Sequence, residues 1–180
     1  MIGFTAMFDG FSDTRIDVAG VTIAASVGGD GPPVLLLHGY PQHRWMWRHI
    51  APPLAERYTV VVPDLRGYGQ SDAPDAGEAT EGYAKRTMAD DQVGLMQALG
   101  FSRFAAIGHD RGARVTHRMC LDHPDAVAAA AVLDIVPTLT LFEATDQDFA
   151  TAYYHWFFLI QAPPLPERMI GADPAFFLRT

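Results

Sequence analysis

The stretch that decides the fold is Gly108-His109-Asp110-Arg111-Gly112. An apolar run at residues 103–107 precedes it, and residues 113–121 follow it with a helical pattern that ends before Pro124. The order strand, sharp turn, helix is typical of a nucleophile elbow, in which glycines on both sides of the central residue allow a tight turn. Such a turn lifts the central side chain into a site and leaves backbone N–H groups and a helix N-terminus facing an anion.

Aspartate takes the central position, where esterases carry serine. A carboxylate there can attack a carbon atom, expel a leaving group and remain as an ester on the enzyme. Asp110 is therefore a candidate nucleophile for hydrolytic displacement rather than for acyl transfer. The alternative is an ordinary turn or N-cap aspartate, because aspartates flanked by glycine are common in turns.

A second motif, His38-Gly39-Tyr40-Pro41, follows the apolar run at residues 34–37. This H-G-x-P pattern is typical of an oxyanion loop, to which Tyr40 would contribute mainly its backbone N–H. We expect the loop to lie beside Asp110, because both follow buried strands and the carboxyl ends of parallel strands meet at one edge of a sheet.

Strands and helices alternate along the chain. We expect a hairpin at residues 15–19 and 21–27, buried strands at 34–37, 58–63 and 127–133, a helix over 43–57 interrupted at Pro52-Pro53, and an amphipathic helix over 81–99. This order predicts an α/β fold with a mostly parallel, doubly wound sheet. From about residue 138 the sequence becomes aromatic and helix-like, and no repeat is present.

Four segments together resemble the α/β-hydrolases that use an aspartate nucleophile, and most closely the fluoroacetate (haloacetate) dehalogenases. They are His38-Gly39-Tyr40-Pro41, the run from Asp64 to Ser71, residues 108–114 and residues 133–137. The first two segments place the chain in a superfamily that includes epoxide hydrolases and haloalkane dehalogenases. The His-Asp-Arg-Gly-Ala-Arg run and the later Tyr154-His155-Trp156 are more selective.

The resemblance implies that residues 1–137 form the N-terminal part of an α/β-hydrolase core and that residues 138–180 begin a helical cap, which is incomplete. It also implies two further core strands and a catalytic histidine beyond residue 180, since none of the seven histidines fits that role by position. Asp134 follows the strand at 127–133, where this branch can carry the acid that orients the histidine. Alternatively, Asp134 merely ends a strand.

Arg111 and Arg114 are three residues apart at a predicted helix start, so they share a face. Guanidinium groups bind carboxylates bidentately, and a chain with a net charge of −8 needs a local cationic cluster to hold an anion. The pair therefore favours a haloacid substrate over a neutral haloalkane. Arginines on helices usually face solvent, however. Arg118 continues the helix face of Arg111 and Arg114, as expected for a solvent-exposed face.

Tyr154, His155 and Trp156 would most often be packing residues, because aromatic side chains at helical spacing usually are. The resemblance implies instead that at least two of them bind the departing halide. Indole, imidazole and phenol groups can each donate a hydrogen bond, and a small, strongly hydrated fluoride ion needs several donors.

The composition is typical of a packed globular enzyme, with 49% hydrophobic and 19% charged residues. Cys120 is the only cysteine, so an intrachain disulfide is excluded. The sequence shows no signal-peptide pattern and no run long enough to span a membrane, so we expect a cytoplasmic protein. The dehalogenase activity that the resemblance implies uses neither cofactor nor metal. A net charge of −8 and a pI near 5.2 argue against nucleic acid and acidic membranes as partners. The resemblance implies a homodimer.

The sequence therefore favours hydrolytic dehalogenation of a small anionic haloacid, most specifically fluoroacetate giving glycolate and fluoride, through an aspartyl ester. An epoxide hydrolase shares the nucleophile and would use tyrosines such as Tyr153 and Tyr154 to protonate the epoxide oxygen. A non-catalytic ligand receptor with a hydrolase fold is the third interpretation, because a fold alone does not define a function.

Overall fold

The structure of the protein is a computed structural model that describes residues 7–75 and 81–179. The chain divides into two compact units, Met1–Ile135 and Val136–Thr180. The border between them falls near the expected start of the cap. The assignment of the second unit as a cap stays a prediction.

The first unit begins with an antiparallel hairpin of β1 (Phe11–Val18) and β2 (Val21–Gly28). Ala19 and Gly20 connect the strands with φ angles of 52° and 85°. Two consecutive positive φ values are what a tight two-residue hairpin turn requires. The expected hairpin is confirmed, although its first strand begins earlier than the pattern indicated.

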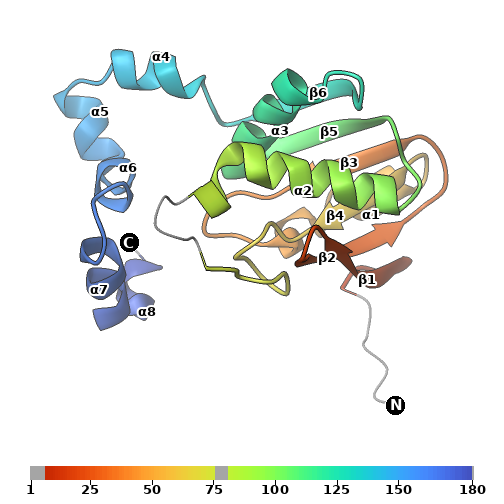
Figure 1. Ribbon diagram of the computed structural model, residues 1–180, viewed down its shortest axis with the longest axis horizontal. Helices are drawn as coiled ribbons and strands as arrows, with labels where there is room; N and C mark the ends of the chain where they lie inside the picture. The colour runs from red at the N-terminus through yellow and green to blue at the C-terminus, as the bar shows by residue number, and fades with distance from the viewer. Residues whose placement is uncertain (1–6, 76–80, 180) are drawn as a thin grey trace. The chain divides into compact units, whose positions relative to one another are not determined.

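Four more strands complete the sheet: β3 (Pro33–Leu37), β4 (Thr59–Pro63), β5 (Phe104–His109) and β6 (Val127–Leu133). The strand order is β1-β2-β4-β3-β5-β6 (Figure 1). Strands β4, β3, β5 and β6 are parallel, whereas β2 pairs antiparallel with β4. The predicted mostly parallel sheet is thus confirmed. Because β4 and β5 lie on opposite sides of β3, the carboxyl end of β3 is a switch point of the kind where α/β proteins bind ligands.

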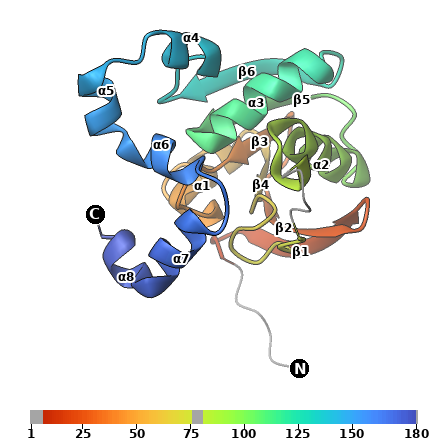
Figure 2. The same cartoon turned by 60° about the vertical axis from the view of Figure 1, so that its left-hand side comes forward.

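Short and long helices connect these strands. They are the 3-10 turns η1 (Arg44–Trp47) and η2 (Glu81–Tyr83) and the helices α1 (Ala51–Ala55), α2 (Lys85–Ala98) and α3 (Arg111–Asp122). Figures 1 and 2 both show α2 and α3 side by side on one face of the sheet. The helix expected over residues 81–99 is therefore α2, preceded by the separate turn η2.

The expected interruption at Pro52 and Pro53 is wrong. Both prolines lie in the first turn of α1, where they begin a helix instead of breaking one. The first N–H groups of a helix have no partner within it, so a residue without an N–H is tolerated there. The preceding residues form η1, and the expected single helix is therefore two separate elements.

Alternate residues of β3 show that both faces of the sheet are covered. Leu36 lies in a buried cluster with Trp47 of η1. Leu35 lies in a second cluster with Met96 of α2 and Val115 of α3. A strand buried on both faces has a continuous apolar sequence, which explains the run at residues 34–37.

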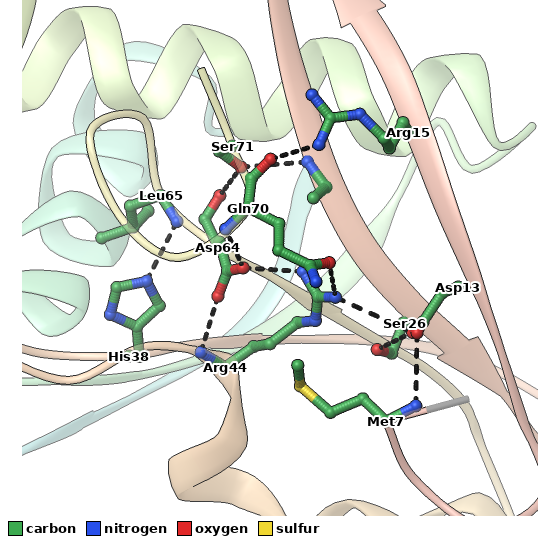
Figure 3. A network of polar contacts seen from close by, with 11 residues as sticks. Met7, Asp13, Arg15, Ser26, His38, Arg44, Asp64, Leu65, Gln70 and Ser71 are labelled. Atoms are coloured by element: carbon green, nitrogen blue, oxygen red, sulfur yellow. Dashed lines mark hydrogen bonds and ion pairs between the residues drawn. The ribbon is translucent and has the colours of Figure 1, made fainter. Parts of the chain in front are cut away.

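A buried ion pair fixes the segment that follows β4 (Figure 3). Arg44 donates to Oδ2 of Asp64 at 2.6 Å from its guanidinium and to Oδ1 at 2.8 Å from its backbone N–H. The exposed fractions of the two side chains are only 1% and 0%. Gln70 donates its backbone N–H to the same carboxylate, and the Ser71 hydroxyl donates to the Asp64 carbonyl. The run from Asp64 to Ser71 is thus a structural loop beside the sheet.

The second unit consists of five short helices. They are α4 (Thr138–Glu143), α5 (Gln147–Ala152), α6 (Tyr154–Leu159), α7 (Leu165–Ala172) and α8 (Pro174–Phe177). Asp146 and Asp173 cap α5 and α8 by accepting backbone N–H bonds of 2.8 and 2.9 Å. Such caps satisfy N–H groups that have no partner within a helix.

Candidate active site

Asp110 lies at the sharp turn between β5 and α3, with φ 47° and ψ −113°. A positive φ is strained for most residues and least so for glycine, asparagine and aspartate. The turn is also tightly packed: a Cβ atom at Gly108 would lie 2.4 Å from the Gly112 carbonyl oxygen, and one at Gly112 would lie 2.4 Å from the Leu37 carbonyl oxygen. Both glycines are therefore required by the close approach of backbone segments.

The loop after β3 contacts the Asp110 side chain directly. The backbone N–H of Tyr40 donates to Oδ2 of Asp110 at 2.9 Å. A Cβ atom at Gly39 would lie only 2.8 Å from Cβ of Asp110, so glycine lets the loop come this close. The structure thus brings the His38–Tyr40 segment and Asp110 together at the carboxyl edge of the sheet, with an N–H group directed at the carboxylate.

His38 is fully buried behind this loop, and both of its ring nitrogens have partners. Nε2 accepts the backbone N–H of Leu65 at 3.0 Å, so it carries no proton. Nδ1 lies 2.9 Å from the Gly39 carbonyl oxygen and therefore acts as the donor. Burial is the main cause that lowers the pKa of His38. His38 is accordingly a neutral histidine that shapes the loop.

Arg111 lies against the ring of Tyr40. Its guanidinium carbon is 4.6 Å from the ring centroid, a cation–π distance. Tyr68 is a second aromatic neighbour: burial raises the pKa of its hydroxyl, while the positive charge of Arg111 and a hydrogen bond from it act in the opposite direction. Arg111 is thus held by two tyrosines beside the carboxylate of Asp110.

Arg114 lies one helical turn further, and its backbone N–H donates to the Asp110 carbonyl at 3.1 Å. Burial lowers the pKa of the Arg114 guanidinium, the charge of Asp110 raises it and the charge of Arg111 lowers it. Arg118, by contrast, pairs with Asp122 on the same helix. The structure therefore groups Arg111 and Arg114 with Asp110 and gives Arg118 a different partner.

Lys85, the first residue of α2, is a further cation near this group that the sequence patterns did not indicate. Burial lowers the pKa of its ammonium group to about 8, and the charges of Arg111 and Arg114 act in the same direction. The carboxylate of Asp110 opposes them. The only sequence signal is that Lys85 is the single lysine among thirteen basic residues.

Asp134 directly follows β6 and has a φ of 60°. It lies next to the elbow, since the Asp110 N–H donates to the Leu133 carbonyl at 3.1 Å. Its side chain is 83% exposed, and Oδ2 lies 3.6 Å from Nε2 of His109. Asp134 is thus at the expected edge of the sheet. Its role in orienting a catalytic histidine stays a prediction.

Tyr154, His155 and Trp156 belong to the second unit, where they form the first turn of α6. The Trp156 and Phe142 ring centroids are 5.9 Å apart, and those of Tyr154 and His155 are 6.0 Å apart. Trp156 therefore packs partly within its own unit. Halide binding by these residues stays a prediction.

Within residues 7–75 and 81–179, no three histidine, cysteine, aspartate or glutamate side chains gather in a way that could hold a metal ion. Over the same described ranges, no helix is both long and apolar enough to cross a membrane.

With this geometry in place, comparison with known families assigns the fold. Residues 32–180 match the family model of the alpha/beta hydrolase fold, and the chain belongs to that family. It is 55% identical to a fluoroacetate dehalogenase from Burkholderia sp over 171 residues, which covers 95% of this chain and 56% of that protein. It is 38% identical to a soluble epoxide hydrolase from Corynebacterium sp. (strain C12), covering 84% of this chain and 51% of the relative.

Among solved structures, a Salmonella enterica protein named as a candidate acyltransferase matches with a TM-score of 0.96 and 54% identity, covering 99% of this chain and 60% of that one. The chain spans a little more than half the length of these two curated relatives. The family model confirms the expected alpha/beta hydrolase fold, and the relatives confirm the resemblance to the fluoroacetate dehalogenases.

Proposed function

We propose that the complete protein hydrolyses haloacetates, and fluoroacetate in particular, to glycolate and halide. The observation that carries this proposal is the grouping of one carboxylate and two guanidinium groups on a single turn, Asp110 with Arg111 and Arg114. A nucleophile flanked by cations suits a substrate whose own carboxylate must be held while its neighbouring carbon is attacked. Similarity to a fluoroacetate dehalogenase supports the same substrate class.

In the first half-reaction, Arg111 and Arg114 bind the haloacetate carboxylate and set its α-carbon in front of Asp110. A carboxylate oxygen of Asp110 forms a bond to that carbon while the carbon–halogen bond breaks, and the halide leaves with the electron pair. The product is the carboxymethyl ester of Asp110, in which the former α-carbon is bonded to the carboxylate oxygen. We assign the halide to donors on His155, Trp156 and Tyr154.

In the second half-reaction, a histidine beyond residue 180, oriented by Asp134, removes a proton from a water molecule that attacks the ester carbonyl. The Tyr40 N–H, which already points at the Asp110 carboxylate, stabilises the oxyanion that forms. When this intermediate collapses, the bond between Cγ of Asp110 and the ester oxygen breaks, and that oxygen takes the proton held by the histidine. Glycolate leaves, and the carboxylate of Asp110 is restored. The homodimer and the cytoplasmic location expected from the sequence stay predictions.

Epoxide hydrolysis is the second candidate function, because it uses the same kind of nucleophile and one relative is named a soluble epoxide hydrolase. Tyr153 and Tyr154 are about half exposed and can donate protons. The two arginines, however, have no role toward a neutral epoxide. Acyl transfer is not favoured, since the position typical of a serine nucleophile holds an aspartate.

The test is to give the complete protein fluoroacetate and, separately, a neutral epoxide such as styrene oxide. We expect fluoride, measured with an ion-selective electrode, to accumulate over many turnovers. A variant lacking the downstream histidine should release about one fluoride per site and carry a carboxymethyl group on the peptide that contains Asp110. Epoxide opening without fluoride release would favour the second function, and an adduct on another residue would refute the mechanism.

A further inference from the structure

The single lysine of the sequence is placed at the start of α2, next to the charged group at the elbow. Of the thirteen basic residues, twelve are arginines. A lysine differs from arginine because its ammonium can lose its proton near neutral pH when it is buried, whereas an arginine stays charged. Among the lysine and the arginines, Lys85 is thus the one residue whose charge can change near neutral pH.

The topology explains why Lys85 comes close to Arg111. Helix α3 follows β5 and begins at the carboxyl edge of the parallel strands. Helix α2 precedes β5, so it runs back from that same edge and begins there too, at Lys85. The two helices pack side by side, as Figures 1 and 2 show. Their N-terminal residues therefore meet at the edge of the sheet that carries Asp110.

The contacts of Lys85 are unusual for a cation. Its side chain is mostly buried, and Nζ lies 3.9 Å from Sδ of the buried Met88. Within the described residues, no carboxylate oxygen lies within 4.0 Å of it as an ion-pair partner. It also lies at the N-terminus of a helix, where the helix dipole disfavours positive charge. The protein thus keeps a poorly compensated cation at this position.

The described charges that act on Lys85 all belong to the start of α3. They are Arg111 and Arg114 of α3 and Asp110 at the start of that helix, and no described charged group of β1 or η2 is among them. Among the described groups that act on Lys85, two are cations and only one, Asp110, is a carboxylate. A second carboxylate, brought by a substrate, would relieve the repulsion among them.

We propose that Lys85 is a specificity-determining residue: its ammonium acts as a third cation, with Arg111 and Arg114, in binding the carboxylate of the substrate. The inference rests on the proposed function and adds a residue to it. The affinity for an anion then depends on the protonation of Lys85, because only the protonated amine attracts a carboxylate. Lys85 is charged below a pH of about 8 and neutral above it, so anion binding should weaken as the pH rises through 8.

The experiment compares three variants of the complete protein. Lys85→Met removes the charge and leaves an apolar side chain that can pack against Met88. Lys85→Arg keeps the charge at every pH in the range. Arg86→Met is the matched control, because it removes one positive charge from the adjacent residue of the same helix, whose side chain is 64% exposed and bonded to Asp122. Calorimetry measures the Kd of acetate, an unreactive carboxylate, from pH 6 to 10. Fluoride release gives KM and kcat for fluoroacetate over the same range.

At pH 7 we expect Lys85→Met to weaken acetate binding and raise KM roughly tenfold, the usual effect of losing one charge-assisted contact. Arg86→Met should change both by less than about twofold. In the wild type, acetate binding should weaken through pH 8, and Lys85→Arg should abolish this dependence. Unchanged acetate affinity in Lys85→Met, or the same dependence in Lys85→Arg, would overturn the inference.

A second measurement needs no variant. The rate of reductive methylation of Lys85, followed by peptide mass analysis, should rise with a midpoint near pH 8, and acetate should protect the amine. Labelling that acetate does not slow would count against the inference. A wild type that binds acetate in the expected pH-dependent way but releases no fluoride would refute the proposed function and leave the role of Lys85 in anion binding supported.

Discussion

The backbone N–H of Tyr40 and the carboxylate of Asp110 form a 2.9 Å hydrogen bond between residues 70 positions apart in the chain. One carboxylate oxygen is thereby held in place by the loop after β3, while the turn after β5 sets the position of the backbone. An asparagine side chain has a carbonyl oxygen that can accept the same N–H bond.

We therefore predict that Asp110→Asn folds normally and loses fluoride release. Asparagine also tolerates the positive φ at this position, so the fold should be kept, but the loss of the carboxylate that attracts Arg114 and Lys85 should lower the unfolding free energy by about 1–3 kcal/mol. Urea denaturation and a fluoride electrode measure the two quantities. Mass spectrometry must exclude slow conversion of the asparagine to aspartate. Undiminished release by a stably amidated variant would remove Asp110 from the mechanism.

Arg114→Leu should impair turnover of haloacetates far more than turnover of any neutral halide or epoxide that the enzyme accepts. Only the acids lose a charge-assisted hydrogen bond, which is worth about 1.5–3 kcal/mol. The comparison is the ratio of kcat/KM values for the two substrate types. Arg118→Leu is the control on the same helix, because its guanidinium pairs with Asp122. Equal losses on charged and neutral substrates would indicate a structural role for Arg114.

The sign of the difference in unfolding free energy between Lys85→Met and the wild type tests whether the folded protein holds a disfavoured charge at Lys85. The pKa of Lys85 falls from 10.5 to about 8 on folding, so below pH 8 the folded state holds a disfavoured charge. Between pH 8 and 10.5 the unfolded chain binds more protons, and wild-type stability should rise with pH. At pH 7 the variant should be more stable than the wild type, by about 1–3 kcal/mol, and the difference should vanish above pH 10.5. A purely structural lysine would give the opposite sign at pH 7 in chemical denaturation.

Arg44→Met should be among the most destabilising single substitutions in the first unit. It leaves the Asp64 carboxylate, whose side chain is 0% exposed, without its cation. Breaking a buried ion pair from one side costs about 3–5 kcal/mol. Arg86→Met removes an arginine from an exposed pair and should cost less than about 1 kcal/mol. Similar losses in the two variants would contradict this account of the pair.

Gly112→Ala should destabilise the protein by about 2 kcal/mol or more, because the added methyl group would overlap the backbone carbonyls of Leu37 and His38. Gly171→Ala is the matched control. No atom lies within 4 Å of the position of its added Cβ, and it lies within α7, where alanine is preferred. Its stability should stay constant or rise slightly in thermal denaturation. An unchanged stability of Gly112→Ala would show that the turn can move away from the backbone of Leu37 and His38 without cost.

Local features of the site could be predicted from the sequence, and features made by distant segments could not. The elbow around Asp110 depends on glycines and apolar runs within a few residues, so its pattern is visible in the chain. Lys85 gains its environment only because α2 and α3 begin at one edge of the sheet. Arg44 is an arginine, a type mostly found at the surface, and only the fold shows that Asp64 holds it inside.

The packing around the elbow also bears on how this scaffold can change its chemistry over evolutionary time. A Cβ atom at Gly39, Gly108 or Gly112 would overlap backbone atoms or nearby side chains, so each of these positions tolerates little substitution. The side chain at position 110 extends from this frame and is joined to the loop after β3 by the hydrogen bond from Tyr40. A different nucleophile could replace the aspartate without disturbing the strands, whereas a methyl group on one of the glycines would displace them. We therefore expect variation in reactivity to arise by substitution at position 110 and at the residues around it, while the turn between β5 and α3 stays the same.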